Sequence, residues 1–332
     1  MINSSQEVEQ EILNIHNTFK KIRTELSRAI VGQDTVIEKL LIALFARGHC
    51  MLVGVPGLAK TLIIKSLGQT LGLSFSRIQF TPDLMPTDIT GSEVLEEDRS
   101  TGTKAFRFIK GPLFANIVLA DEINRTPPKT QSALLEAMQE YNVTISGTAF
   151  DLERPFFVLA TQNPIEQEGT YPLPEAQLDR FMFSLWLDYP SFEEEIEIVE
   201  RTTSREIPQL ESCIERADIL KYQEIIRKVP VARNTIEYAT RMISATRKES
   251  SYCDDTLRGW IRWGAGPRAT QNLILASKVR AVLHNRLSPD SSDVDAVAEA
   301  ILRHRIVTTF NAEAEGVGIR EILSHILEKI KD

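Results

Sequence analysis

Residues 54–61 read Gly54-Val55-Pro56-Gly57-Leu58-Ala59-Lys60-Thr61, and the rest of the chain is organised around them. An apolar run at residues 50–53 precedes them and is typical of a buried strand, and a helical pattern at residues 62–71 follows. Strand, glycine-bearing loop, Lys-Thr and helix form the layout of a phosphate-binding loop. Its backbone N–H groups converge on a phosphate, and the helix directs the positive end of its dipole there. The sequence therefore predicts a nucleotide site at residues 54–61 and Leu62.

Two residues of this loop would act directly on the phosphates. Lys60 would neutralise the β- and γ-phosphates, and the hydroxyl of Thr61 would bind Mg²⁺. The general pattern has glycine directly before the lysine, whereas this chain has Ala59. The loop alone is therefore an imperfect match, and other parts of the chain have to support it.

Length, composition and charge restrict the class of protein. The 332 residues are enough for two domains, and 42% apolar with 25% charged residues is ordinary for a soluble globular protein. The net charge of −8 disfavours nucleic acid as a partner, and no uncharged run is long enough to span a membrane. The N-terminus has no signal-peptide pattern, and the three cysteines are too widely spaced to give a disulfide framework. We therefore expect a cytoplasmic protein.

Polar side chains follow two predicted buried strands. The apolar run at residues 116–120 ends at Asp121 and Glu122, and the run at residues 156–161 leads to Asn163. Open α/β sheets bind ligands at the carboxyl ends of their strands. There Asp121 would hold Mg²⁺ through water, Glu122 would act as general base, and Asn163 would hydrogen-bond the attacking water or the γ-phosphate. The alternatives are a solvated strand end for the two acids and a simple turn for Asn163.

Two arginines are candidates for stabilising charge during phosphoryl transfer. Arg180 follows Asp179 and precedes a predicted strand at residues 181–187. It is either an arginine finger that reaches the γ-phosphate of a neighbouring subunit or a surface partner of Asp179. Arg268 begins a predicted helix, where the dipole disfavours a cation. That position favours a bound anion over a simple loop charge.

The pattern changes at residues 189–191. Ser191 and Glu194 have the spacing of a helix capping box, and the chain beyond them is helical. Before this point strands and helices alternate, interrupted by predicted hairpins at residues 93–109 and 143–152. We therefore predict an α/β parallel-sheet core at residues 1–190 and an all-helical domain at residues 191–332.

Six segments in order make the chain similar to the MoxR-type AAA+ ATPases, from about residue 30 to about residue 270. They are Ile30-Val31-Gly32-Gln33, residues 54–61, Leu119-Ala120-Asp121-Glu122-Ile123-Asn124-Arg125, Ala160-Thr161-Gln162-Asn163-Pro164, Leu173-Pro174-Glu175-Ala176-Gln177-Leu178-Asp179-Arg180-Phe181 and residues 264–269. The family commonly carries Ala-Lys-Thr in its phosphate loop. Ala59 therefore fits the family although it departs from the general pattern.

The resemblance implies a role for each matching residue. Val31 and Gly32 would lie against adenine, Lys60 and Thr61 match Walker A, Asp121 and Glu122 match Walker B, Asn163 matches sensor 1, Arg180 the arginine finger and Arg268 sensor 2. The first hairpin, at about residues 91–110, looks like the helix-2 insert of this clade. The second, at about residues 142–153, resembles its pre-sensor-1 hairpin.

The resemblance also implies an activity and partners. A MoxR-type protein would be an ATPase with an AAA+ core and a C-terminal helical lid, using ATP and Mg²⁺. It would form a homo-oligomeric, hexameric ring and act as a chaperone on client proteins, with von Willebrand factor A domain proteins as further partners. Three alternatives remain: the I subunit of a metal chelatase, a nucleic-acid motor and a scaffold that binds ATP without hydrolysing it. Glu93 and Glu96 on the first hairpin disfavour the nucleic-acid motor, and an intact Glu122 disfavours the scaffold.

Overall fold

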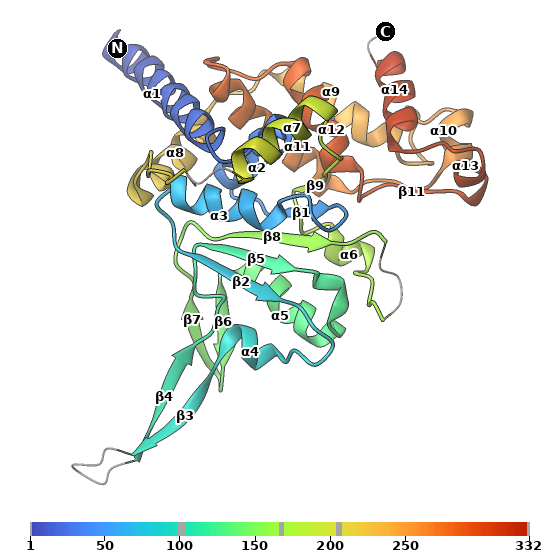
Figure 1. The fold of residues 1–332 in the computed structure, drawn as a ribbon. Coiled ribbons are helices and arrows are strands. Elements are labelled where there is room, and N and C mark those ends of the chain that lie inside the picture. The colour runs from blue at the N-terminus through green and yellow to red at the C-terminus, as the bar shows by residue number, and fades with distance from the viewer. Residues whose placement is uncertain (1, 98–103, 166–168, 204–207, 331–332) are drawn as a thin grey trace.

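The computed structural model describes residues 2–97, 104–165, 169–203 and 208–330 (Figure 1). At its centre lies a five-stranded parallel sheet in the order β2-β5-β8-β1-β9. The strands are β1 (Cys50–Val53), β2 (Phe75–Gln79), β5 (Ile117–Asp121), β8 (Phe157–Gln162) and β9 (Phe183–Trp186). This arrangement confirms the predicted α/β parallel-sheet core.

The order of the strands brings the predicted polar residues to one edge. β8 lies between β1 and β5, with Cys50 paired to Leu159 and Leu119 also paired to Leu159. The strands are parallel, so the segments that follow them meet at the carboxyl edge of the sheet. The loop after β8 therefore lies between the phosphate loop after β1 and the two acids at the end of β5.

Alternate side chains of the central strands supply two separate cores. Cys50 and Leu52 of β1 pack into a core shared with α1 (Ile2–Leu26), α2 (Asp34–Phe45), α3 (Lys60–Thr70) and the helices of the C-terminal half. Met51 and Val53 point to the opposite face, where α5 (Pro128–Glu140) packs. The two-residue alternation of a strand explains this division. The sheet is consequently buried on both faces, as its nearly continuous apolar runs require.

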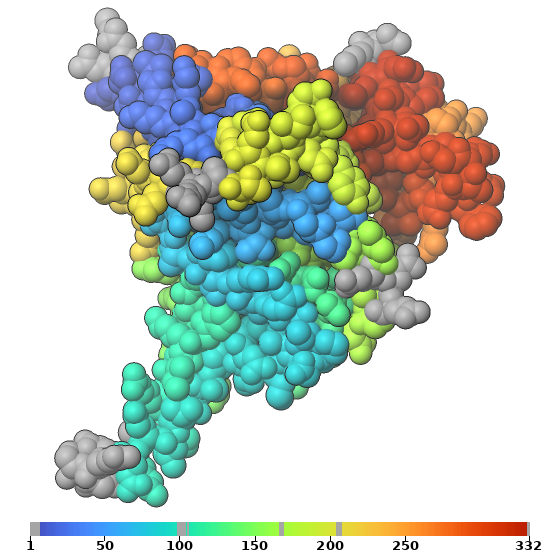
Figure 2. All heavy atoms as spheres, viewed as in Figure 1, coloured from blue at the N-terminus to red at the C-terminus, as the bar shows by residue number. Residues whose placement is uncertain are grey.

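Two antiparallel hairpins lie at the positions where the sequence predicts hairpins. β3 (Gly91–Glu97) and β4 (Lys104–Lys110) form the first, which projects from the body as a narrow arm (Figures 1 and 2). Its predicted turn at residues 98–102 lies outside the described residues. β6 (Asn142–Ile145) and β7 (Thr148–Asp151) form the second around Ser146 and Gly147, whose φ angles are 49° and 83°. Two positive φ angles match the strand twist in a two-residue hairpin loop.

Three short elements differ from the prediction. The proline-bearing stretch after β2 contains a helix, α4 (Pro86–Thr90), because Pro86 starts it and the Asp88 carboxylate accepts a hydrogen bond from the Met85 N–H at 2.8 Å. The C-terminal half is helical apart from β10 (Ile261–Trp263) and β11 (Val307–Thr308), which pair antiparallel. Strands of two or three residues are too short to show an alternating pattern. The remaining elements are η1 (Ile123–Arg125), α6 (Glu175–Leu178), α7 (Phe192–Thr203), α8 (Arg216–Lys228), α9 (Arg233–Ala245), α10 (Asp255–Trp260), α11 (Pro267–Leu283), α12 (Ser291–Leu302), α13 (Phe310–Ala314) and α14 (Ile319–Ile330).

The N-terminal helix joins the two halves of the molecule. α1 lies against both α3 and α11, and the Nδ1 of His16 is 2.6 Å from the carbonyl oxygen of Leu283. The proposed boundary between residues 190 and 191 stays a prediction, since the core around α1 and α2 continues into the C-terminal helices. Across the described helices, none combines the length and the apolar character needed to cross a membrane.

Candidate functional site

The phosphate loop connects β1 to α3 and has three unusual backbone positions. Gly54 starts it against β9, since a Cβ on Gly54 would lie 3.0 Å from the Cβ of Leu187. Gly57 has a φ of 89°, and Ala59, at the N-cap of α3, has a φ of 54°. Ala59 thus adopts the left-handed conformation that explains the usual glycine at this position. The Nζ of Lys60 folds back over the loop and donates to the carbonyl oxygen of Gly54 at 2.5 Å.

This loop is shaped to receive phosphate. A Cβ on Gly57 would meet no heavy atom of the described residues within 4 Å, so the loop is open at that point. Among those residues, no side chain caps the N-terminus of α3, which leaves the first N–H groups of the helix for a ligand. Thr61 and Leu62 occupy this first turn. Unsatisfied N–H groups and the helix dipole together favour an anion.

The segment predicted to contact adenine lies beside the phosphate loop. Gly32 has a φ of 65° and presses against the carboxylate of Glu194 at the start of α7, while Val31 is half-buried next to it. The Nε2 of Gln33 donates to the carbonyl oxygen of Asp188 at 3.3 Å. Asp188 directly follows Leu187, the neighbour of Gly54. The structure therefore places residues 31–33 close to the start of the phosphate loop, and their contact with adenine stays a prediction.

Asp121, at the end of β5, is a buried carboxylate with both oxygens engaged. Its Oδ1 accepts from the hydroxyl of Thr161 at 2.6 Å, and its Oδ2 accepts from Arg77 at 2.7 Å. The hydroxyl of Thr161 fixes the orientation of the carboxylate toward the sheet edge. Such an oriented, buried carboxylate fits the binding of a hydrated Mg²⁺, because outer partners hold it in place. A metal ion would compete with Arg77 for Oδ2.

Glu122 is held by neighbouring side chains. Its backbone N–H donates to the same hydroxyl of Thr161 at 2.9 Å, and its φ of 58° turns the chain sharply after the strand. Its Oε2 accepts from the Nε2 of Gln79 at 2.7 Å and from Arg125 at 2.9 Å. The acid pair is thus no solvated strand end, because both carboxylates belong to one hydrogen-bonded network.

Asn163 is buried where β8 leaves the sheet. Its Oδ1 accepts from the N–H of Ile165 at 3.2 Å, which is the local bond of a turn. The strand order places it between the phosphate loop and Asp121. The turn and the predicted contact with the attacking water are compatible, since the turn bond uses the side-chain oxygen of Asn163 and not its amide nitrogen.

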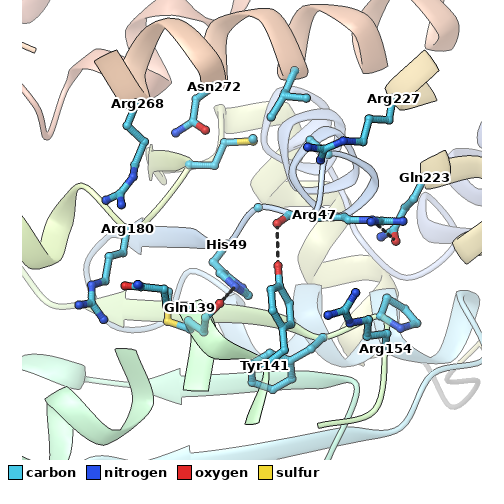
Figure 3. A pocket seen from close by; sticks show the side chains of 17 residues that line it. Arg47, His49, Gln139, Tyr141, Arg154, Arg180, Gln223, Arg227, Arg268 and Asn272 are labelled. Carbon is cyan, nitrogen blue, oxygen red and sulfur yellow. Dashed lines mark hydrogen bonds between the residues drawn. The ribbon is translucent and has the colours of Figure 1, made fainter. Parts of the chain in front are cut away.

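Arg180 and Arg268 line a different part of the molecule. Both border a cavity of about 360 Å³ that also has Arg47, Arg154 and Arg227 on its walls (Figure 3). Figure 3 shows Arg268 extending from α11 toward Arg180 on one side of the cavity. Five arginines around one cavity make it strongly attractive to an anion.

This cavity lies at the amino edge of the sheet. His49 precedes β1, Phe156 precedes β8 and Met182 precedes β9, and all three border the cavity. The phosphate loop follows β1 at the carboxyl edge, so the sheet separates Arg180 and Arg268 from it. Arg180 does not pair with Asp179; it donates to the carbonyl oxygen of Leu135 at 2.8 Å. The carboxylate of Asp179 instead pairs with Arg268 at 2.9 Å.

Comparison with known proteins finds matches over both halves of the chain. The model of the ATPase family associated with various cellular activities (AAA) matches residues 49–183, and the AAA lid domain model matches residues 259–326. The Chaperone MoxR1 of Mycobacterium tuberculosis is 43% identical over 314 residues, which cover 95% of this chain and 82% of that protein. The chain belongs to the MoxR-type AAA+ ATPases. The Protein MoxR of Methylorubrum extorquens is 30% identical over 86% of each chain.

A solved structure shows how completely the MoxR-type fold is shared. A crystal structure from Cytophaga hutchinsonii superposes with a TM-score of 0.91 and 42% identity over 98% of both chains. The AAA match runs from the residue before β1 to the first residue of β9, and the lid match spans α10 to α14. Both the sheet and the C-terminal helices are therefore features of the family.

Several residues of this MoxR-type site were not predicted from the sequence. They are Arg77, Gln79, Arg125, Thr161 and Arg305. Arg77 and Gln79 alternate on β2, and two polar residues on one face of a strand next to the Walker B strand were a usable signal. Thr161 was also accessible, as a hydroxyl inside an otherwise apolar strand. Arg305 gave no such signal, because its partner Asp179 is remote in the sequence.

Proposed function

We propose that this MoxR-type protein hydrolyses ATP in a ring of identical subunits, with each ATP held between two of them. One subunit would supply the phosphate loop, Asp121, Glu122 and Asn163. The next would supply Arg180 and Arg268. The observation that carries this proposal is the position of the two arginines at the amino edge of the sheet, opposite the phosphate loop.

The geometry favours action between subunits over action within one. β1 spans four residues, or about 13 Å at the usual rise of a strand, between His49 beside the arginines and Gly54 of the loop. The sheet fills the space between, so neither arginine lines the loop of its own subunit. A repeated contact between unlike surfaces of identical chains closes into a ring. We propose six subunits, as the family resemblance implies.

Each residue of the loop edge has a defined task in this proposal. Lys60 and the N–H groups of α3 bind the phosphates, and Thr61 and Asp121 hold Mg²⁺, which would neutralise charge on the phosphates when bound. Glu122 takes the proton of the attacking water after release from Gln79 and Arg125. Asn163 orients that water. Arg180 and Arg268 of the neighbour stabilise the charge that develops on the γ-phosphate.

We further propose that the cycle remodels client proteins. The first hairpin carries exposed apolar side chains on a projecting arm, among them Leu95 at 56% and Phe106 at 73% exposure. Exposed apolar residues that cluster on one surface are typical of protein-binding sites. Glu96 and Glu97 on the same arm pair with Arg107 and Lys104, so the two described strands offer no net positive charge to a nucleic-acid backbone. Client proteins in the cytoplasm, and von Willebrand factor A domain proteins as helpers, are the partners that we propose.

The trans arrangement predicts complementation between two inactive variants. Glu122→Gln should bind ATP but not hydrolyse it, because it lacks the base, and Arg180→Ala should be at least about 10³-fold slower. In an equal mixture of both, roughly a quarter of the interfaces pair an intact Glu122 with an intact Arg180. Steady-state ATPase assays on co-assembled subunits should therefore recover activity.

The control is each variant assayed alone. Size-exclusion chromatography should show that the two variants share one assembly. Co-assembly without any recovered activity would contradict the trans arrangement. Arg180 would then act within its own subunit or only stabilise the fold.

A further inference from the structure

Arg305, three residues after the end of α12, holds the backbone that carries Arg180. Its side chain is 2% exposed. The guanidinium donates to the carboxylate of Asp179 at 2.7 Å and to three carbonyl oxygens of the same segment, Asp179 at 3.0 Å, Phe181 at 2.7 Å and Met182 at 3.2 Å. These bonds surround Arg180 on both sides in the sequence. Its backbone is therefore fixed from the C-terminal half of the chain.

Asp179 also connects Arg305 to Arg268. Its Oδ1 accepts from Arg305, and its Oδ2 accepts from Arg268 at 2.9 Å. One carboxylate thus connects the end of α12 with the start of α11. The neighbouring His304 lies close to the same segment, with its Nε2 3.0 Å from the carbonyl oxygen of Phe181. Arg180, Arg268 and the lid are consequently joined into one hydrogen-bonded unit.

Fold stability alone gives a weak reason for an arginine at this position. Burial of a guanidinium costs free energy, and apolar residues of similar volume often replace buried ion pairs without loss of stability. A lysine could not take over the contacts, because only the planar fork of arginine reaches several acceptors in a fixed geometry. The arrangement is well suited to holding a backbone in one position.

We propose that Arg305 is a positioning residue for hydrolysis in the adjacent subunit. Through Asp179 and the backbone of residues 179–182, it would present Arg180 and Arg268 together to one neighbouring ATP. A shift of the lid would then move both arginines at once. This inference rests on the proposed trans arrangement.

The test is complementation with Arg305→Met, which removes the guanidinium but keeps an unbranched buried side chain. The variant alone should bind ATP with a Kd within about threefold of the parent, because its own phosphate loop is untouched. Its kcat should fall about 10²-fold, the scale expected for a misplaced catalytic group. Mixed with Glu122→Gln, it should recover ATPase activity, since the partner supplies correctly held arginines and Arg305→Met supplies an intact base.

Recovery separates positioning from general damage, because a disordered subunit would not hydrolyse ATP with any neighbour. Arg320→Met is the matched control: it removes an exposed lid guanidinium paired with Glu299 and should keep full activity. Arg305→Lys should be nearly as slow as Arg305→Met if the fork geometry matters.

Three results would overturn the inference, and they are distinguishable. If Arg180→Ala recovers with Glu122→Gln but Arg305→Met does not, Arg305 is structural and the trans arrangement stands. If neither mixture recovers despite co-assembly, the trans arrangement fails and the inference fails with it. Parental activity of Arg305→Met alone would also refute it.

Discussion

Ala59 is typical of the family, yet its backbone conformation is unfavourable for alanine. Its φ of 54° lies in the left-handed region, which is unfavourable for a residue with a Cβ by about 1 kcal/mol or more. The same turn directs the N–H groups of α3 into the phosphate loop. The loop therefore keeps a strained alanine where glycine would be relaxed.

Ala59→Gly should relieve this strain and raise the free energy of unfolding by about 1 kcal/mol. The greater entropy of glycine in the unfolded chain offsets part of this gain. Thermal unfolding of the two proteins without nucleotide measures the difference. Gly57→Ala is the matched control, because its φ of 89° also penalises a Cβ although the space around it is open. The control should be destabilised. A lower melting temperature for Ala59→Gly would show that the strain is not there.

The candidate site residues could be predicted where they follow a strand that the sequence pattern reveals. Asp121, Glu122 and Asn163 come directly after apolar runs, and parallel strands carry such residues to one edge. The partners of these residues could not be predicted in the same way. Gln79 and Thr161 act through contacts between strands, and a contact between strands depends on the strand order rather than on a motif.

At the scale of elements, the first hairpin is attached to the body at its base, where Phe108 also stacks on Phe150 of the second hairpin with 4.2 Å between the ring centroids. Its two ends meet at the body, where Gly111 donates to the carbonyl oxygen of Thr90 at 3.3 Å and a Cβ on Gly91 would lie 2.6 Å from the nitrogen of Gly111. Beyond this base, Leu95 and Phe106 are directly paired across the two strands. The arm can therefore change without disturbing the sheet.

The double variant Leu95→Ser and Phe106→Ser should separate client binding from hydrolysis. Both side chains are exposed, so stability and basal ATPase activity should stay within about twofold of the parent. Stimulation by a permanently unfolded, carboxymethylated polypeptide should be lost, as measured by ATPase rate against polypeptide concentration.

Phe310→Ser, at a residue that is 83% exposed on the lid, is the control for loss of any surface aromatic. A shortened protein with Gly91 joined to Gly111 should behave like the double variant. Unchanged stimulation in both would remove the hairpin from client binding.

Element prediction succeeded where an apolar run or a turn signal marks the element and failed where neither does. The five sheet strands and both hairpins follow such signals, whereas α4, β10 and β11 do not. Contacts with neighbouring residues fix these three elements. β10 forms because Ile261 is buried and pairs with Thr308 of β11.

At the scale of the whole molecule, the functional groups fall at the two edges of one sheet. The sequence pattern could place most of these groups next to a strand and Arg268 at the start of a helix, but it could not show that the two arginines lie at the edge opposite the phosphate loop. Nor could it show that α1 packs on α11 or that Arg305 reaches Asp179, since these contacts join distant parts of the chain. In the ring that we propose, a single subunit would therefore hold two incomplete halves of different sites.

His49 makes the stability of this molecule depend on pH. It is buried between β1, α5 and β8, where its Nε2 lies 3.1 Å from the carbonyl oxygen of Met138 and its Nδ1 accepts from the N–H of Val158 at 3.1 Å. Both contacts are consistent with a neutral ring. Burial lowers the pKa of His49 from 6.5 to about 4, and burial also lowers the pKa of His304.

Between pH 6.5 and about 4, His49 is protonated in the unfolded chain but not in the folded protein. The stability of the protein therefore falls as the pH falls through this range. Between pH 7.5 and 5 the loss from His49 should be about 2 kcal/mol.

His49→Gln keeps a donor and an acceptor but does not titrate. It should be less stable than the parent at pH 7.5 and show a flatter decline toward pH 5, measured as urea midpoints across the range. His304→Gln should flatten the decline in the same direction. Parallel pH profiles for the parent and His49→Gln would mean that folding does not lower the pKa of His49.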